Sequence, residues 1–487
     1  MLRPASPPTP KRQAAASAFG AIKKGDFSMS HAHSAAAVDI GRTLDHGPFS
    51  SLQKMVVLMA ALSIILDGFD GQLIGFAIPV MMKEWGIARS AFAPAVATGL
   101  VGMAIGSAFA GYMADRIGRR LVIAASVALF GATTIAIGFA PNIDAITVLR
   151  FIAGLGIGGA LPSASTLTAE FTPLKYRTVA VTGTIVSYPL GGMLAGLFAS
   201  FVLPTLGWRA MFWIGGALPL AYSFFLLARL PESPRLMARH SAQWPQLRTL
   251  LARMQRPTAA DAPFVDAVEQ AAGQKQNAGF GALFKDGLAR DTLAIWMGFF
   301  MVMLASYSAF SWLPSMLTAE GLPVSMASSG LTAYNLGGVL GALGCAWAMS
   351  RFGSRWPLAL ACAGAAASAL ALKGVDFHQD ASLLMLGLGV HGMFVNGVQA
   401  PMYALCAHVY ATHIRATGTA AGLAFGRLGA ILSSFAGAAI ITSNGAQGYL
   451  SLLGYAMLAA LVALFLVKHH IRGRRAADTP STNAKAA

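Results

Sequence analysis

The sequence predicts an all-α integral membrane protein with twelve membrane-spanning helices in two six-helix halves. Hydrophobic residues make up 56% of the 487 residues and charged residues only 11%, whereas a soluble domain carries about 25% charged residues. Apolar runs of about 20 residues, the length that a helix needs to cross a bilayer, recur along the chain. A polar segment after the sixth run divides the chain into halves of six, an arrangement typical of transporters.

The chain divides into five predicted segments. Residues 1–48 are rich in Ala, Ser and Pro with no apolar run, so we expect a disordered tail. Six spans fill residues 49–230, a basic polar loop follows at 231–290, six further spans fill 291–468, and 469–487 form a second tail. The predicted spans are 55–80, 92–113, 121–140, 145–169, 179–202, 209–230, 291–314, 326–349, 356–373, 381–406, 416–441 and 447–467.

Local similarities relate the two halves. Residues 175–178 after the fourth span match residues 413–416 after the tenth, and Arg116 has a counterpart in Arg351 or Arg355. The same offset aligns Asp67 and Asp70 with uncharged residues. Because only the first half has the acidic pair, we expect the proton chemistry to take place in the first half and not in the second.

The net charge of +16 is unevenly distributed. Most Lys and Arg residues fall in segments that share one side of the membrane. By the positive-inside rule this side is cytoplasmic, so we expect both termini in the cytoplasm. We also expect the protein to lie in the cell inner membrane and to have no nucleic-acid partner. The three cysteines all lie in apolar spans and indicate no disulfide framework.

Asp67 and Asp70 are the most informative residues in the first span. Asp67 lies about 18 Å into the span at ~1.5 Å per residue, near the bilayer midplane. The three-residue spacing puts both carboxyls on one helix face. A charge at this depth costs ~2.5–3.5 kcal/mol, so intramembrane acids usually serve function. We expect a proton-coupling site, the alternative being a pair neutralised by buried arginines.

The loop between the second and third spans, residues 111–120, reads GYMADRIGRR. It resembles the signature loop of the major facilitator superfamily, which gates the conformational cycle. The resemblance implies a gating role for Gly111, Asp115, Arg116, Gly118, Arg119 and Arg120. The second-half copy has Ser350 where an acid is expected, which weakens a symmetric second gate.

Further gating candidates flank the same side. Residues 231–235, PESPR, resemble a motif of sugar porters and organic-acid porters, and we expect Glu232 and Arg235 to form gate ion pairs. Glu170 is expected to join this gate with Arg116 and Arg177. Arg415 is the second-half equivalent of Arg177. Arg150, nearer the other end of span four, either steers anions inward or holds a helix in place.

Four further motifs are similar to the aromatic acid:proton symporter family of that superfamily. They are residues 67–70 (DGFD), 150–159, 312–314 (WLP) and 396–399 (NGVQ), the last running on to 415–418 and 427–429. The resemblance implies proton-coupled uptake of benzoate or hydroxybenzoate acids by alternating access.

Arg427 is the leading candidate for holding the acid. It lies about 16 Å into span eleven at ~1.5 Å per residue, and a guanidinium pairs with a carboxylate through a planar fork. The alternative role is that of a structural partner for Asp67 or Asp70. The other candidate substrate-binding residues are polar or aromatic side chains of the central spans: Phe69, Tyr307, Trp312, His391, Asn396 and Gln399.

Other functions stay open at this point. The chain has no phosphate-binding loop, no nucleophile–base set and no metal-ligand cluster, so we expect no enzyme activity, no ATP use, no cofactor and no metal. The alternatives are a sugar or non-aromatic acid carrier, an exporter or antiporter, and a sensor that does not transport. We expect a monomer that contacts the lipid bilayer, the acid and protons.

Overall fold

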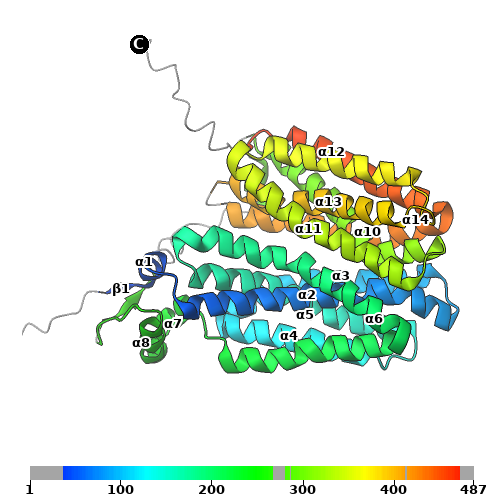
Figure 1. The fold of residues 1–487 in the computed structure, drawn as a ribbon. Coiled ribbons are helices and arrows are strands. Elements are labelled where there is room, and N and C mark those ends of the chain that lie inside the picture. The colour runs from blue at the N-terminus through cyan, green and yellow to red at the C-terminus, as the bar shows by residue number, and fades with distance from the viewer. Residues whose placement is uncertain (1–36, 261, 267–279, 286, 412–413, 472–487) are drawn as a thin grey trace, which may run out of the picture.

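The computed structural model describes residues 37–260, 262–266, 280–285, 287–411 and 414–471. Two helical bundles lie side by side, the N-terminal half below and the C-terminal half above in Figure 1. The helices of both bundles run roughly parallel to one long direction, as expected of segments that cross a bilayer.

The N-terminal bundle consists of five continuous helical segments. They are α2 (Ser51–Trp85), α3 (Ala93–Ile117), α4 (Arg119–Ile137), α5 (Ile143–Phe171) and α6 (Leu174–Arg229). A capping box of Ser50 and Gln53 starts α2, and Gly86 ends it in the left-handed conformation. Gly207, with φ 77°, breaks α6 into two helices, so this bundle has six.

The C-terminal bundle repeats this pattern. It consists of α10 (Ala289–Ala319), α11 (Val324–Phe352), α12 (Arg355–Ala371), α13 (Ala381–Val409) and α14 (Arg415–Leu466), with α14 broken at Gly445, φ 59°. Among the described residues, nine of these segments are long and apolar enough to span a membrane. Counting the broken α6 and α14 as two helices each, and adding the less apolar α11, gives the twelve predicted spans. The fold prediction is confirmed.

Short elements connect or cover the bundles. They are β1 (Val38–Asp39), α1 (Ile40–Asp45), η2 (Arg89–Phe92), α7 (Pro234–Arg239), η3 (Ser241–Gln243), α8 (Trp244–Arg253), β2 (Phe264–Val265), η4 (Phe280–Phe284) and η5 (Leu372–Gly374). The end of the molecule that carries α1, α7 and α8 is called the basic end below, and the other the opposite end.

The predicted disordered tail 1–48 is wrong in its last part. Strand β1 pairs in parallel with β2, and α1 packs on α7. Ile40 and Leu44, four residues apart, are fully buried there. Two apolar residues are too few to give a periodic signal in the sequence, so this order comes from tertiary packing. Residues 1–36 and 472–487 of the two predicted tails lie outside the described residues.

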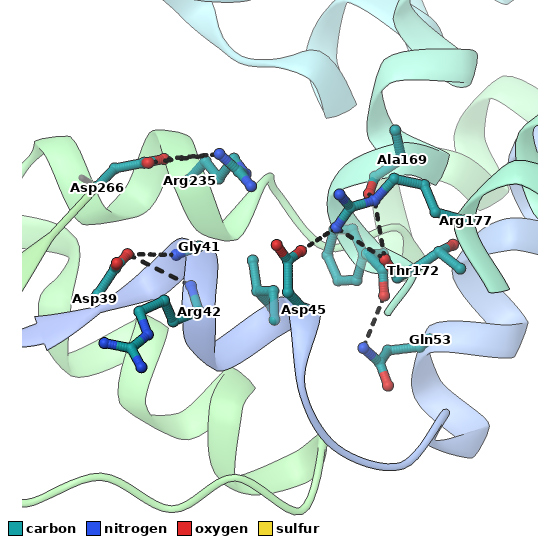
Figure 2. A network of polar contacts seen from close by, with 12 residues as sticks. Asp39, Gly41, Arg42, Asp45, Gln53, Ala169, Thr172, Arg177, Arg235 and Asp266 are labelled. Atoms are coloured by element: carbon teal, nitrogen blue, oxygen red, sulfur yellow. Dashed lines mark hydrogen bonds and ion pairs between the residues drawn. The ribbon is translucent and has the colours of Figure 1, made fainter. Parts of the chain in front are cut away.

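Polar contacts fasten this segment to the bundle (Figure 2). Asp39 caps α1 by accepting hydrogen bonds from the backbone of Gly41 and Arg42. Asp45 forms an ion pair with Arg177 at the start of α6. Arg256, after α8, donates 2.9 Å to the carbonyl of Leu44. Burial lowers the pKa of Arg256, and the nearby Asp45 opposes that change.

The two halves meet along helices from both bundles. Helix α11 packs against α6, α14 against α3, and α10 against α2. Gly75 of α2 allows the last contact, because a Cβ there would lie 2.4 Å from the carbonyl oxygen of Phe310. The interface therefore brings α2, α3, α10 and α14, which carry the predicted acids and Arg427, close together.

Candidate functional site

The acidic pair lies at the centre of the N-terminal bundle. Asp67 is 2% exposed and Asp70 is fully buried. Thr134 of α4 donates a hydrogen bond to Asp70 Oδ1, while Asp67 Oδ1 and Asp70 Oδ2 have no hydrogen-bond partner in the described structure. Each carboxyl thus keeps an oxygen that can bind or release a proton.

Each acid has an arginine within electrostatic reach, Arg427 for Asp67 and Arg150 for Asp70. Arg150 is buried, and its guanidinium lies 3.5 Å from the carbonyl oxygen of Gly71. Among the described residues, no ion pair within 4.0 Å joins these acids to these arginines. The carboxyls are therefore near positive charge without being fixed in salt bridges.

Arg427 reaches from α14 across the interface between the halves. Its Nη1 donates 2.9 Å to the hydroxyl of Tyr307 and lies 2.6 Å from the sulfur of Met103 on α3. Its Nε is buried and has no partner in the described part of the chain. A guanidinium has five N–H donors, so Arg427 retains donors for an anionic ligand.

Aromatic side chains surround this guanidinium. The ring of Tyr307 lies 5.6 Å from that of Phe310, and Phe310 lies 6.1 Å from Tyr188 and 5.9 Å from Tyr334. Tyr403 and Tyr188 are both within electrostatic reach of Arg427. A cation beside clustered phenol rings is the chemistry that an aromatic carboxylate needs.

Sequence reasoning missed Tyr188 as a site residue. It lies on α6, close to Asp67, Arg150 and Arg427. Gly71 makes room for it, since a Cβ there would lie 3.1 Å from the Tyr188 hydroxyl. A tyrosine followed by proline inside an apolar helix was the available signal. Met103 and Thr134 gave no signal, because both residue types are ordinary in membrane helices.

The structure does not bring all predicted substrate residues to Arg427. Trp312 is fully buried against Gly437 of α14. Phe69 packs on Phe198 of α6, 5.4 Å between ring centres. These two side chains contact helices of their own half, so the prediction that they line the ring site is not supported in this conformation.

Of the three polar candidates, two form hydrogen bonds away from Arg427 and one lies near its helix turn. His391 Nδ1 lies 3.1 Å from both Ser368 Oγ and the carbonyl oxygen of Ala365, and thus turns toward α12. Asn396 donates to the carbonyl of its own helix at Gly392, 3.1 Å away. The Gln399 side-chain nitrogen lies 4.0 Å from the sulfur of Met303. Met303 in turn packs against Gly426, the residue before Arg427 on α14.

The predicted gate forms a compact polar cluster at the basic end. Arg119 makes two contacts with Glu170, 2.8 and 2.9 Å long. Glu232 accepts hydrogen bonds from the backbone N–H of Arg119 at 2.9 Å and of Arg120 at 3.3 Å. These contacts join the α3–α4 turn to the ends of α5 and α6. Gly118 turns there with φ 105°, where only a glycine fits easily against Glu232.

Several gate partners differ from the prediction. Glu170 pairs with Arg119 rather than with Arg116, which stacks over the ring of Tyr112. Arg177 pairs with Asp45. The sequence predicted that these side chains lie at the same end of the bundle. It could not determine which of the neighbouring arginines pairs with Glu170.

The remaining gate candidates are less tightly held. Arg235 pairs with Asp266 at 3.1 Å rather than with Glu232. Asp115 is exposed and 3.6 Å from Arg119. Arg415 is exposed and donates to the carbonyl of Tyr410 at 3.4 Å. Gly111 has open space where a Cβ would be.

The two ends of the interface between the halves differ. Toward the opposite end, Gln72 of α2 and Asn335 of α11 exchange two side-chain hydrogen bonds, 2.8 and 3.2 Å long. Arg89 donates 2.9 Å to Ser315 across the halves. At the basic end a cavity of about 240 Å³ separates α6 from α11 and α13. It is lined by residues 178, 182 and 185 of α6, residues 342, 346, 349 and 350 of α11, residues 400, 401 and 404 of α13, and Ile471. This conformation is closed at the opposite end.

Paired six-helix bundles with polar side chains facing their interface define a secondary transporter of the membrane. The profile of the Major Facilitator Superfamily matches residues 60–372 and 295–486. The chain belongs to this superfamily, as its motifs predicted, and is a multi-pass membrane transporter rather than an enzyme. Among the described residues no group of His, Cys, Asp and Glu side chains could hold a metal.

Characterised relatives cover nearly the whole chain. It is 33% identical over 450 residues to a gallate transporter of Pseudomonas putida, covering 92% of this chain and 98% of the relative. It is 34% identical over 404 residues to a 4-hydroxybenzoate transporter of Pseudomonas aeruginosa, covering 83% and 90%. The inward-open xylose transporter of E. coli has a similar fold, with TM-score 0.66 at 19% identity over 89% of this chain and 98% of that one.

Proposed function

We propose that this chain is a proton-coupled importer of an aromatic carboxylate of the benzoate and hydroxybenzoate class. The observation that carries the proposal is the position of Arg427, whose guanidinium keeps free donors beside Tyr307 and faces the partner half. The substrate carboxylate binds this guanidinium, and the ring lies among Tyr188, Tyr307 and Phe310. The similarity to gallate and 4-hydroxybenzoate transporters supports the aromatic class.

Proton coupling follows from the shared charge of Arg427. This guanidinium is within electrostatic reach of Asp67. A bound carboxylate competes with Asp67 for the same positive charge, so binding of the acid and of a proton at Asp67 support one another. Asp70, with its partner Thr134, is the second proton site. With the acid bound and one of the two carboxyls protonated, the two arginines, the remaining carboxylate and the bound acid carry no net charge as the halves reorient.

The basic end faces the cytoplasm in this proposal, since its loops hold most of the Lys and Arg residues. The protein then lies in the cell inner membrane with both ends of the chain in the cytoplasm, and acts as a monomer. The conformation described above, closed at the Gln72–Asn335 contact, faces the cytoplasm. The cluster of Arg119, Glu170 and Glu232 controls the return to the outward-facing conformation.

Purified protein in proteoliposomes tests the proposal. Labelled 4-hydroxybenzoate is added outside at low pH with a higher pH inside. We expect accumulation above the external concentration, abolished by a protonophore, and displacement by unlabelled benzoate or gallate. Xylose and succinate serve as the sugar and the non-aromatic acid competitors.

Three results would contradict the proposal, each in a different part. If xylose or succinate but not benzoate displaces the labelled 4-hydroxybenzoate, the substrate is a sugar or a non-aromatic acid rather than an aromatic carboxylate. Accumulation that persists without a pH gradient would remove proton coupling. Substrate movement only against the direction of proton entry would make the chain an exporter or antiporter.

A further inference from the structure

A second cavity, of about 590 Å³, lies at the basic end of the N-terminal bundle, away from the transport interface. Residues 45–49, which lead from α1 into α2, form one wall. Lys54 on the first turns of α2 and Lys175 and Tyr176 at the start of α6 form the other. The ordered segment that follows the N-terminal tail therefore encloses this cavity.

Two cations bracket an aromatic pair in its wall. Phe49 and Tyr176 stack with ring centres 5.6 Å apart. The Lys54 ammonium lies 5.9 Å from the centre of the Phe49 ring, and the Lys175 ammonium 5.4 Å from that of Tyr176. The rings hold both ammonium groups beside the same space.

The charge of this cavity is not balanced by the protein. Its one acid, Asp45, is paired with Arg177, which also donates to the carbonyl oxygen of Thr172 (Figure 2). Within the described ranges neither Lys54 nor Lys175 has an acidic partner. The cavity therefore favours an anionic group.

Exposed aliphatic side chains lie one helical turn from the two lysines. Leu58, one helical turn beyond Lys54, is 69% exposed, and Val179, one turn beyond Lys175, is 76% exposed. Residues four apart share a helix face. Each lysine thus lies above an exposed aliphatic side chain, so the site matches a molecule with an anionic head and apolar chains.

We propose that this cavity binds the phosphate group of an anionic phospholipid. The phosphate lies between Lys54 and Lys175, and the acyl chains run along Leu58 and Val179. Basic pockets between spanning helices are a known way of holding such headgroups. The proposal is independent of which acid the protein transports.

The test uses full-length protein in neutral detergent, titrated with phosphatidylglycerol and followed by thermal unfolding. Lys54→Gln/Lys175→Gln removes both cations, and Lys285→Gln/Lys468→Gln removes two exposed lysines of the same end as a matched control. At ~1 kcal/mol per basic residue near a lipid headgroup, we expect about 30-fold weaker apparent affinity in the first variant. The control and Lys54→Arg/Lys175→Arg should bind as the unchanged protein does.

The proposal is overturned if the Lys54→Gln/Lys175→Gln protein keeps the affinity, or if the control pair loses as much. It is also overturned if phosphatidylcholine stabilises the unchanged protein equally. Inorganic phosphate is the last arm: equal stabilisation at the same concentration without lipid would assign the cavity to a soluble phosphate instead. None of these measurements depends on transport, so failure here leaves the proposed function untouched.

Discussion

Replacing Arg427 separates its role as a substrate anchor from a purely structural one. In Arg427→Lys the charge stays, but the planar fork is lost. One charge-assisted hydrogen bond contributes about 1.5–3 kcal/mol, so the dissociation constant for 4-hydroxybenzoate should rise roughly 10- to 150-fold. Arg427→Ala leaves the acid without a counter-charge, and losing one partner of a buried pair costs about 3–5 kcal/mol.

The assay is equilibrium binding to purified protein, with thermal stability measured on the same sample. Tyr307→Phe is the matched control, because it keeps the ring beside Arg427 and removes only the hydroxyl that accepts the 2.9 Å hydrogen bond. This variant leaves the charge and the planar fork of Arg427 in place, so it should lose less affinity than Arg427→Lys.

A double variant excludes the structural explanation. If Arg427 serves only as counter-charge to Asp67, adding Asp67→Asn to Arg427→Ala removes the unpaired acid and should restore both stability and binding. If Arg427 is the anchor, stability recovers while binding stays lost. Tight binding by a stable Arg427→Ala protein, alone or in the double variant, would refute the anchor role.

Three further predictions concern coupling, the gate and the closed end. Asp67→Asn and Asp70→Asn should each abolish accumulation against a gradient in proteoliposomes, and concentrative uptake by both would place the proton site elsewhere. Gly118→Ala should slow uptake several-fold and leave equilibrium binding intact, because its φ of 105° and the contact with Glu232 oppose a side chain; normal uptake would contradict the gate role. Asn335→Ala removes both hydrogen bonds to Gln72, so labelling of a cysteine introduced at Ser311, which lies beside Gly75 in the interface, should become faster; unchanged labelling would show that this contact does not hold the end closed.

The helices and their buried charges could be predicted from the sequence. A bilayer requires about 20 apolar residues per crossing, and every charge inside such a run stands out against it. Asp67, Asp70 and Arg427 were found in this way. The loop motif at residues 111–120 could also be recognised, since its glycines and charges have fixed spacing. Gly118 and Arg119 of this motif lie in the polar cluster at the basic end, and their gating role stays a prediction.

Tertiary structure alone decided which side chains meet. Trp312 and Phe69 pack within their own halves, while Tyr188 lies close to Arg427, although all three are aromatic residues of apolar helices. In a soluble helix the polar face marks the outside, but lipid chains are as apolar as a protein interior, so a membrane helix carries little signal of which side faces a neighbour. The order of residues 37–50 could not be predicted for a related reason. Ile40 and Leu44 are buried only because α1 packs on α7 and β1 pairs with β2, which lie about 200 residues further along the chain.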